Sequence, residues 1–289
     1  MAVNYATKYS SNVDEKFTKE SIVAGAINQD YDWEGTTAIK VYSVGTSALN
    51  DYTLTGTNRY GTPAELDNEV QTMVLSQDKS FTFTIDKKSQ DDTVGVMEAG
   101  KALAREIREV VVPTIDKYVL QRMVNAVGSK ATGTIKDFYG TFLDATNALD
   151  DADVPSDGRI CYVSSAFRKG IMLDSNFIKS GDLSQNMVIT GQVGEVDGVA
   201  IVKGGNRLPA GVDFVMTHPI ATTYAMKLEE YKVHDDAPGI SGSLVEGRIR
   251  YDAFVRKNKK DAIYVHSATA ITADDSAKWD SEITKETKG

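Results

Sequence analysis

Cysteine and histidine are both scarce in this sequence. Cys161 is the only cysteine among 289 residues, so no disulfide can form within the chain and a reducing compartment is expected. It lies in an apolar run, which predicts a buried, inert thiol rather than a nucleophile. None of the three histidines has a cysteine or an acidic residue at the spacing of metal ligands. Neither a disulfide scaffold nor a metal centre is therefore predicted, and no cofactor is expected.

Long apolar runs are also missing. No stretch of about 18 apolar residues occurs, so a transmembrane helix is not expected. The amino terminus lacks the basic stretch followed by an apolar one that marks a secretory signal. These absences predict a protein that is made and kept in the cytoplasm and has no membrane partner.

The motifs of common enzymes are absent as well. The stretch 239–243 approaches the nucleophile elbow of hydrolases, but serine stands at 243, where that motif needs its second glycine. The glycines between 191 and 198 lack the dinucleotide-binding spacing and are better explained by turns. Nothing assembles into a catalytic constellation, so the chain is predicted not to be an enzyme.

Positive charge is in deficit. Lysine and arginine number 32 against 41 acidic residues, which gives a net charge of −9. A chain of this charge is repelled by nucleic acid, which argues against a DNA-binding regulator but is compatible with a container. The exception is a basic cluster near the end of the chain: Arg248, Arg250, Arg256, Lys257, Lys259 and Lys260. This cluster is either a solvated turn or a contact to acidic loops of a neighbouring subunit or to enclosed nucleic acid.

The strongest pattern that is present is helical and spans residues 91–127. Apolar residues recur at intervals of three and four with charges between them. At a rise of 1.5 Å per residue, such a helix is about 50 Å long, which is more than most globular domains need. Pro113 lies inside it and removes the hydrogen bond to the carbonyl of Glu109, so a kink is predicted there.

Two segments before this helix have little core of their own. Residues 1–30 carry a thin apolar stripe that includes Phe17, which indicates either an arm that packs on something else or a frayed terminus. Strand-like alternation follows at 39–44 and 70–85, with about 25 residues between the two runs. This connection is poor in aliphatic residues, and Tyr52 and Tyr60 favour packing against a partner over disorder.

The rest of the chain is a mixture of short helices and strands. Helices are predicted at 138–150 and 167–177, and strands at 159–163 and 195–202. The last structured unit is predicted to be a hairpin that carries the basic cluster. Its two strands would be 248–255 and 262–266. Beyond residue 267 the chain is small and polar and is expected to be a loose tail.

This order of elements resembles the major capsid proteins of tailed bacteriophages, which have the Hong Kong 97-type fold. The resemblance covers about residues 1–267 and extends to short stretches that look like those of capsid proteins from phages of Gram-positive bacteria. These stretches are Asn58–Pro63, Phe81–Asp86, Val96–Lys101, Val154–Arg159, Gly194–Val199 and Tyr251–Val255. Each motif alone is weakly specific, but six in the same order are considerably more specific. The resemblance implies an α+β fold.

The family's organisation implies a division of this chain into five parts. These are an amino-terminal arm (1–30), an extended β-hairpin loop (31–80), a peripheral domain (81–155 and 243–267) built on the spine helix 91–127, an axial domain (156–242) and a flexible tail (268–289). The family assembles as hexamers and pentamers into an icosahedral head around double-stranded DNA, which is enclosed without sequence-specific binding. A portal protein at one vertex is a further implied partner. Because the chain reaches its arm and loop almost immediately, a separate scaffolding protein is expected.

Some family members join their subunits through isopeptide bonds from a lysine of the extended loop. No lysine occurs between Val41 and Asp78, so the loop tip cannot donate an amine and a non-covalent shell is predicted. The candidate contact residues are Asn58, Arg59, Tyr60, Tyr52 and Phe17. Arg59 is either a clamp on an acidic patch of the adjacent subunit or an ordinary exposed arginine.

Two other structural roles compete with that of a phage head. A cellular nanocompartment shell shares the fold but encloses enzymes. A tail tube subunit is disfavoured because tube proteins consist mostly of strands and lack a long spine helix. A virion protein that is assembled in the bacterial cytoplasm is therefore the expectation that the sequence supports best.

Overall fold

A computed structural model describes residues 21–29, 31, 38–44, 47–63, 65, 68–87, 99–174, 192–234 and 237–272. Its strands are β1 (Ala38–Val44), β2 (Asn68–Val74), β3 (Gln77–Asp86), β4 (Ser129–Thr132), β5 (Ile160–Val163), β6 (Gln192–Val196), β7 (Val199–Lys203), β8 (Val212–Thr217), β9 (Thr222–His234), β10 (Gly242–Val255) and β11 (Ile263–Ser267). Its helices are α3 (Ala99–Glu106), α4 (Val112–Asn125), α5 (Phe138–Asp151) and α6 (Ser165–Leu173), with short η1 (Ala24–Ala26), η3 (Gly205–Arg207) and η4 (Lys257–Ala262). The chain is thus an α+β protein, as the sequence predicted.

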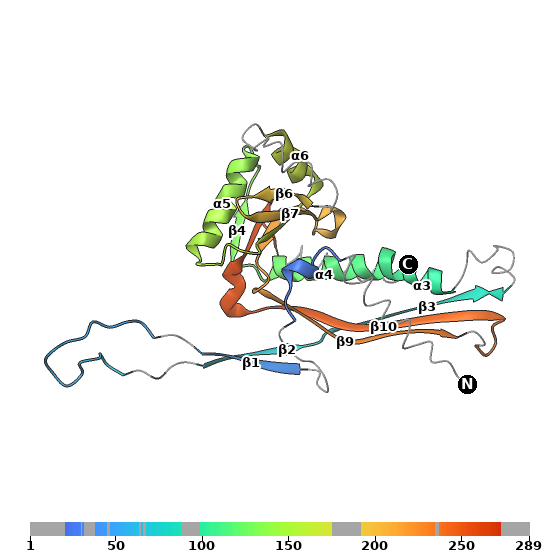
Figure 1. The fold of residues 1–289 in the computed structure, drawn as a ribbon, viewed down its shortest axis with the longest axis horizontal. Coiled ribbons are helices and arrows are strands. Elements are labelled where there is room, and N and C mark those ends of the chain that lie inside the picture. Colours follow the sequence, from blue (N-terminus) through green and yellow to red (C-terminus); the bar gives the residue numbers. More distant parts are fainter. Residues whose placement is uncertain are drawn as a thin grey trace.

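The spine of the molecule is a rod formed by α3, a π-helical segment (η2, Ile107–Val111) and α4 (Figure 1). The predicted helix is therefore present from residue 99, and its first residues, 91–98, lie outside the described part. Pro113 stands in the first turn of α4, directly after the π-helical segment, and the hydroxyl of Thr114 donates to the carbonyl of Val110 over 2.6 Å. A π-helical turn is one way in which a helix accommodates a disrupted hydrogen-bond ladder. The kink at Pro113 stays a prediction.

A long antiparallel sheet packs under this rod, with the strand order β3-β10-β9 (Figure 1). Burial alternates along β3, where Phe81 and Phe83 face the core and Ser80 and Thr82 face solvent. This period of two is what the sequence showed at 81–85. The main core gathers buried apolar residues of the rod, of the inner face of this sheet and of strands β5, β8 and β11.

Gly247 sits where two aromatic rings of neighbouring strands cross β10. A β-carbon at this position would lie 2.4 Å from the ring of Phe81 and 2.9 Å from that of Tyr231. Overpacking of this kind usually costs about 1–3 kcal/mol, so Gly247→Ala is expected to lower the free energy of unfolding by that amount. Urea denaturation of the dissociated subunit measures it, with Ser80→Ala on the solvent face as a control that changes little. Equal unfolding midpoints for the two variants would contradict this packing.

A second sheet forms the other lobe, with the strand order β4-β11-β8-β5-β7-β6. Helices α5 and α6 contribute to its core, and their first turns are capped by Asp137, which accepts from the amide of Gly140, and by Ser164, which accepts from that of Phe167. Cys161 lies on β5 at 0% exposure, and burial raises the pKa of its thiol. The prediction of a buried cysteine is confirmed, and a thiol in this environment is a poor nucleophile.

The predicted closing hairpin is wrong. Strand β10 pairs with β3 and β9, whereas β11 pairs with β4 and β8 in the six-stranded sheet. The turn η4 does not fold the chain back but carries it from one sheet to the other. Burial explains why β11 does not pair with β10. All five residues of β11 are buried, so the strand lies inside a sheet with a neighbouring strand on each edge.

The sheets also cross the predicted domain division. Strand β9 falls in the predicted axial segment (156–242) but pairs with β10 of the predicted peripheral segment. Strands β4 and β11 fall in the peripheral segments but belong to the six-stranded sheet. The five-part division of the chain therefore stays a prediction. Of the predicted tail, 268–289, residues 273–289 lie outside the described residues.

Candidate functional site

A two-stranded sheet, β1-β2, leaves the body as a projecting hairpin (Figure 1). The strands are antiparallel, from the pair Ala38 and Val74 at the root to the pair Val44 and Asn68 at the far end. One face of the hairpin belongs to the body, because Ile39 and Met73 join a small apolar cluster with Ala225 of β9. The sequence therefore places both strands correctly, but β2 and β3, read there as one run from 70 to 85, belong to different sheets.

The opposite face of the hairpin is apolar and uncovered. Tyr42 is 63% exposed, and Val70 and Val74 are 44% and 51% exposed. Lys40 shares this exposed face, since it alternates with the inward-facing Ile39 and Val41. A sheet that is apolar on both faces and covered on one needs a second surface to bury the other.

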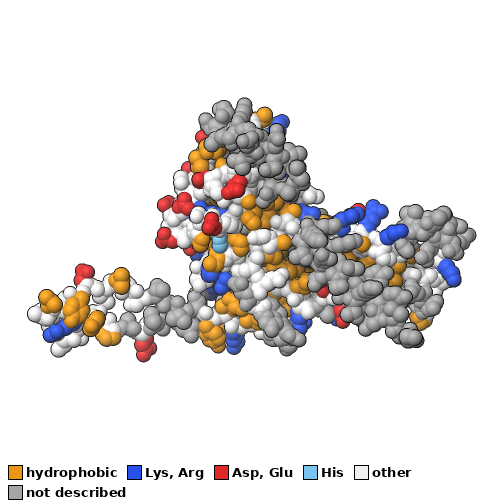
Figure 2. Space-filling model, viewed as in Figure 1, with side chains coloured by type: hydrophobic (Ala, Val, Ile, Leu, Met, Phe, Trp, Pro, Cys, Tyr) orange, Lys and Arg blue, Asp and Glu red, His pale blue; other side chains and the backbone are white. Residues whose placement is uncertain are grey.

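The described part of the connection, residues 47–63, extends beyond the sheet and exposes further apolar side chains. Figure 2 shows apolar side chains gathered at the end of this projection. Leu49, Leu54 and Tyr60 are 101%, 81% and 84% exposed. The tip makes contacts within itself: Tyr52 and Tyr60 pack edge to face at 5.0 Å, and the amide of Thr53 donates to the carbonyl of Arg59.

The structure brings four of the predicted contact residues together at this tip, namely Asn58, Arg59, Tyr60 and Tyr52. Arg59 donates from Nε to the carbonyl of Gly56 over 3.2 Å, a contact within its own loop. The role of Arg59 as a clamp on a neighbouring subunit stays a prediction. The contact of the other tip residues with a neighbouring subunit stays a prediction as well. Phe17, the fifth residue, lies outside the described part of the chain.

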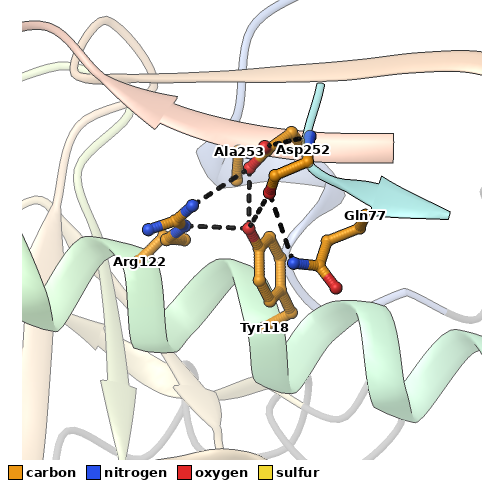
Figure 3. A network of polar contacts seen from close by, with 6 residues as sticks. Gln77, Tyr118, Arg122, Asp252 and Ala253 are labelled. Atoms are coloured by element: carbon orange, nitrogen blue, oxygen red, sulfur yellow. Dashed lines mark hydrogen bonds and ion pairs between the residues drawn. The ribbon is translucent and has the colours of Figure 1, made fainter. Parts of the chain in front are cut away.

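A buried carboxylate fixes the root of the hairpin (Figure 3). Asp252 of β10 is 0% exposed and accepts hydrogen bonds from the amide of Ser76 at 2.9 Å and from the hydroxyl of Tyr118 at 2.7 Å. Its own neighbour, Ala253, donates a third through the backbone amide at 2.7 Å. Ser76 is the corner residue between β2 and β3, so one side chain joins the hairpin root to β10 and the spine helix.

The spine helix supplies the counter-charge. Arg122 lies 3.6 Å from the carboxylate of Asp252 and donates from Nε to the hydroxyl of Tyr118 at 2.9 Å. Burial, together with the nearby carboxylate of Asp252, raises the pKa of the Tyr118 hydroxyl, which therefore stays protonated and donates. Sequence reasoning missed this network, which we call the root network: Ser76, Tyr118, Arg122 and Asp252.

The described part of the predicted arm, residues 21–29, is anchored on the body. Ser21 and the amide of Ile22 both donate to Asp116, a carboxylate at 0% exposure that also pairs with Arg207 at 2.5 Å. Asn28 donates to the carbonyl of Pro219 and accepts from the hydroxyl of Thr223. Residues 1–20 lie outside the described part, so the expectation that the arm packs on another copy stays a prediction.

The basic cluster does not form one surface. Arg248 and Arg250 lie on β10, and Arg248 makes a two-fold contact with Asp78 of β3 at 2.9 and 2.6 Å. Arg256 donates to the hydroxyl of Tyr31 and to the carbonyl of Ile220, while Lys257, Lys259 and Lys260 stand in the turn η4. The six charges are therefore divided between a sheet face and a turn between two sheets, and their contact to a neighbour or to nucleic acid stays a prediction.

Three further findings concern metal ligands, a buried histidine and membrane-spanning helices. Within the described ranges, no three His, Cys, Asp or Glu residues are grouped so that they could hold a metal ion. His266 faces Asp213 at 2.9 Å in a largely buried pair that packs on the ring of Phe214. In the same part of the chain, no helix combines the length and apolarity needed to cross a membrane.

Comparison with known proteins shows which folds this architecture is similar to. No protein-family model and no curated protein matches the chain. Among solved structures, the chain is similar to one of Mycobacterium phage Che8 at a TM-score of 0.63, with 20% identity over 87% of this chain and 92% of that one. It is similar to the mature capsid of bacteriophage PhiM1 at 0.65, with 15% identity over 87% and 88%.

A third similar structure is a virus-like particle from Pyrococcus furiosus, at a TM-score of 0.57 and 11% identity over 92% of this chain and 100% of that one. At these identities the likeness concerns the fold. The fold predicted from the sequence motifs is confirmed: the chain has the Hong Kong 97-type fold of phage capsid proteins.

Proposed function

We propose that this chain is the major capsid protein of a tailed bacteriophage, a structural subunit that assembles with copies of itself into the icosahedral head around double-stranded DNA. The observation that carries the proposal is the projecting hairpin, whose tip exposes Leu49, Leu54 and Tyr60 far from the core of its own chain. Apolar side chains at the end of a projection gain burial only on another molecule. The capsid fold of the similar structures supports a second copy as that molecule.

Many copies of such a contact make a strong container even if each contact is modest. The proposed subunits form hexamers and pentamers, with a portal protein at one vertex and a separate scaffolding protein during assembly in the bacterial cytoplasm. The negative net charge of −9 supports a wall to which the packaged DNA does not adhere. The proposed role is structural and not catalytic, and it depends on the contacts between subunits.

The shell is expected to be non-covalent. The loop has no lysine between Val41 and Asp78 that could attack an asparagine of a neighbouring subunit. Assembled particles boiled in detergent should therefore run on a denaturing gel as a single band at the 31.4 kDa of the monomer. A ladder of multiples of that mass would overturn this prediction.

Electron microscopy of the purified protein tests the proposed function itself. Closed shells or ring-shaped capsomers are expected, in equilibrium with free subunits at low concentration. If the protein remains a monomer at all accessible concentrations, the proposed function is wrong.

A cellular nanocompartment shell is the second candidate, because the virus-like particle from Pyrococcus furiosus is among the similar structures. The content of particles purified from infected or expressing cells distinguishes the two. A phage head contains nuclease-protected double-stranded DNA when the packaging machinery is present, whereas a nanocompartment contains protein cargo.

A further inference from the structure

The described part of the arm crosses the seam between the two lobes of the subunit. It begins where Asp116 of the spine helix α4 meets Arg207 of η3, which belongs to the lobe of the six-stranded sheet. The hydroxyl of Ser21 donates to one carboxylate oxygen of Asp116 at 2.5 Å, and the amide of Ile22 donates to the other at 3.0 Å. The hydroxyl of Tyr162 on β5 donates to the carbonyl of Ile22 at 3.0 Å. Two consecutive arm residues are therefore bonded to the spine and to the second lobe.

The other end of this arm segment binds where the chain passes from one sheet to the other. A short crossover joins β8 of the six-stranded sheet to β9 of the three-stranded sheet. The side chain of Asn28 donates to the carbonyl of Pro219 in this crossover at 2.9 Å and accepts from the hydroxyl of Thr223 at 2.8 Å. Its backbone amide donates to the carbonyl of Thr222, and its carbonyl accepts from the amide of Tyr224. Asn28 thus fixes the arm to the crossover through both its side chain and its backbone.

Between these two anchors the segment is packed into the body. Val23 and Ala26 are 2% and 0% exposed and belong to the main core. At Gly25 a β-carbon would lie 3.1 Å from the side chain of Ile160 on β5, so the backbone of the segment runs close to the six-stranded sheet. A segment that is bonded at both ends and buried between them is an integral part of the seam.

The bonds of the segment differ in kind from the core that the two lobes share. That core is apolar and gathers residues of both sheets around the spine helix. Apolar contact is non-directional, so it holds two bodies together without selecting one angle between them. Hydrogen bonds to a buried carboxylate are directional, and buried polar networks specify one arrangement of the groups that they join.

We propose that residues 21–29 act as a strap that holds the two lobes in one orientation, and that undocking of the strap lets the lobes rotate about the crossovers between the sheets. One crossover joins β8 to β9, and the other is η4, between β10 and β11. A strapped subunit presents the surfaces of both lobes in a fixed arrangement, which lowers the entropic cost of association. The inference concerns the single subunit and goes beyond the proposed function, so its failure leaves the shell function standing.

Single-molecule fluorescence energy transfer on the free, full-length subunit measures the orientation of the lobes. Dyes are attached through Asn147→Cys on α5 and Thr84→Cys on β3, two exposed positions on different lobes (Figure 1). The native Cys161 is buried and does not react. Ala26→Glu places a carboxylate at a fully buried strap position, so the strap cannot dock although neither lobe is altered. The wild type is expected to give one narrow distance distribution, and Ala26→Glu one at least about twice as wide.

Gln29→Glu is the matched control, since it adds the same carboxylate to the strap at an exposed position. It is expected to keep the narrow distribution of the wild type. Asn28→Ala removes the two side-chain bonds to the crossover region and is expected to widen the distribution, but less than Ala26→Glu does. Circular dichroism checks that each variant is folded.

Two results would show that the strap does not set the orientation of the lobes. One is a folded Ala26→Glu variant with the narrow distribution of the wild type, and the other is a wild type that is already as broad as this variant. If Ala26→Glu does not fold, Asn28→Ala decides the question, and an unchanged width in that variant overturns the proposal.

Discussion

Replacing Asp252 with alanine is expected to lower the free energy of unfolding of the subunit by about 3–5 kcal/mol. Asp252→Ala leaves the amides of Ser76 and Ala253 and the hydroxyl of Tyr118 without this acceptor, and removes the carboxylate that lies 3.6 Å from Arg122. Buried groups without partners cost their full desolvation, which is larger than the net contribution of the bonds themselves. Chemical denaturation of the dissociated subunit measures the change.

Asp78→Ala provides the matched control for this prediction. Asp78 also pairs with an arginine, Arg248, but both side chains are about half exposed, and such pairs contribute less than about 1 kcal/mol. Asp252→Asn, which keeps the shape and one acceptor oxygen, is expected to fall between the two. If Asp252→Ala proves no more costly than Asp78→Ala, the root network does not hold the hairpin corner.

The second large effect is expected at the hairpin tip and concerns assembly rather than folding. In a triple variant, Leu49, Leu54 and Tyr60 are each replaced by serine, which removes three large exposed apolar side chains. Burial of one such side chain is worth about 1.5–3 kcal/mol, so the loss at each contact is at least about 4 kcal/mol. Association should then require about a thousandfold more protein. The stability of the free subunit should be unchanged, because these side chains lie outside every core cluster.

A triple threonine-to-serine variant at positions 53, 55 and 57 is the control for the tip. It alters three exposed residues of the same loop but removes little apolar surface. Light scattering of both triple variants across a concentration series gives the comparison. Normal assembly of the Leu49, Leu54 and Tyr60 variant would mean that the tip is not a contact surface.

Periodicity along the sequence predicted the elements whose burial repeats regularly. Alternation at Phe81–Ile85 predicted β3, which has one buried face, and the three-and-four spacing of apolar residues after residue 99 predicted the spine helix, although α4 proves to be buried on most of its surface. The prediction of a closing hairpin was wrong because β11 does not have one buried and one exposed face. Strand β11 is buried on both faces, so its apolar run carries no sign of which strands flank it, and nearness in sequence suggested β10.

The candidate site was predictable only in part. An unusually long connection rich in tyrosine and threonine predicted the projecting loop and placed Tyr52 and Tyr60 on it. The root network was not predictable, because Asp252 occupies a position in β10 that alternation assigns to the solvent face. It is buried there because the hairpin root crosses that face, a contact between residues 176 positions apart in the chain.

Amide hydrogen exchange over the hairpin tip, residues 47–63, compared between free subunits and assembled particles, tests most directly whether the tip is buried on a neighbouring copy. If a neighbouring copy buries the tip, exchange of these amides is fast in the free subunit and slows by at least about a hundredfold on assembly, because closing an interface worth about 3 kcal/mol protects them by that factor. Slow exchange of the same residues in the free subunit would contradict the account, since the tip would then be stable on its own body.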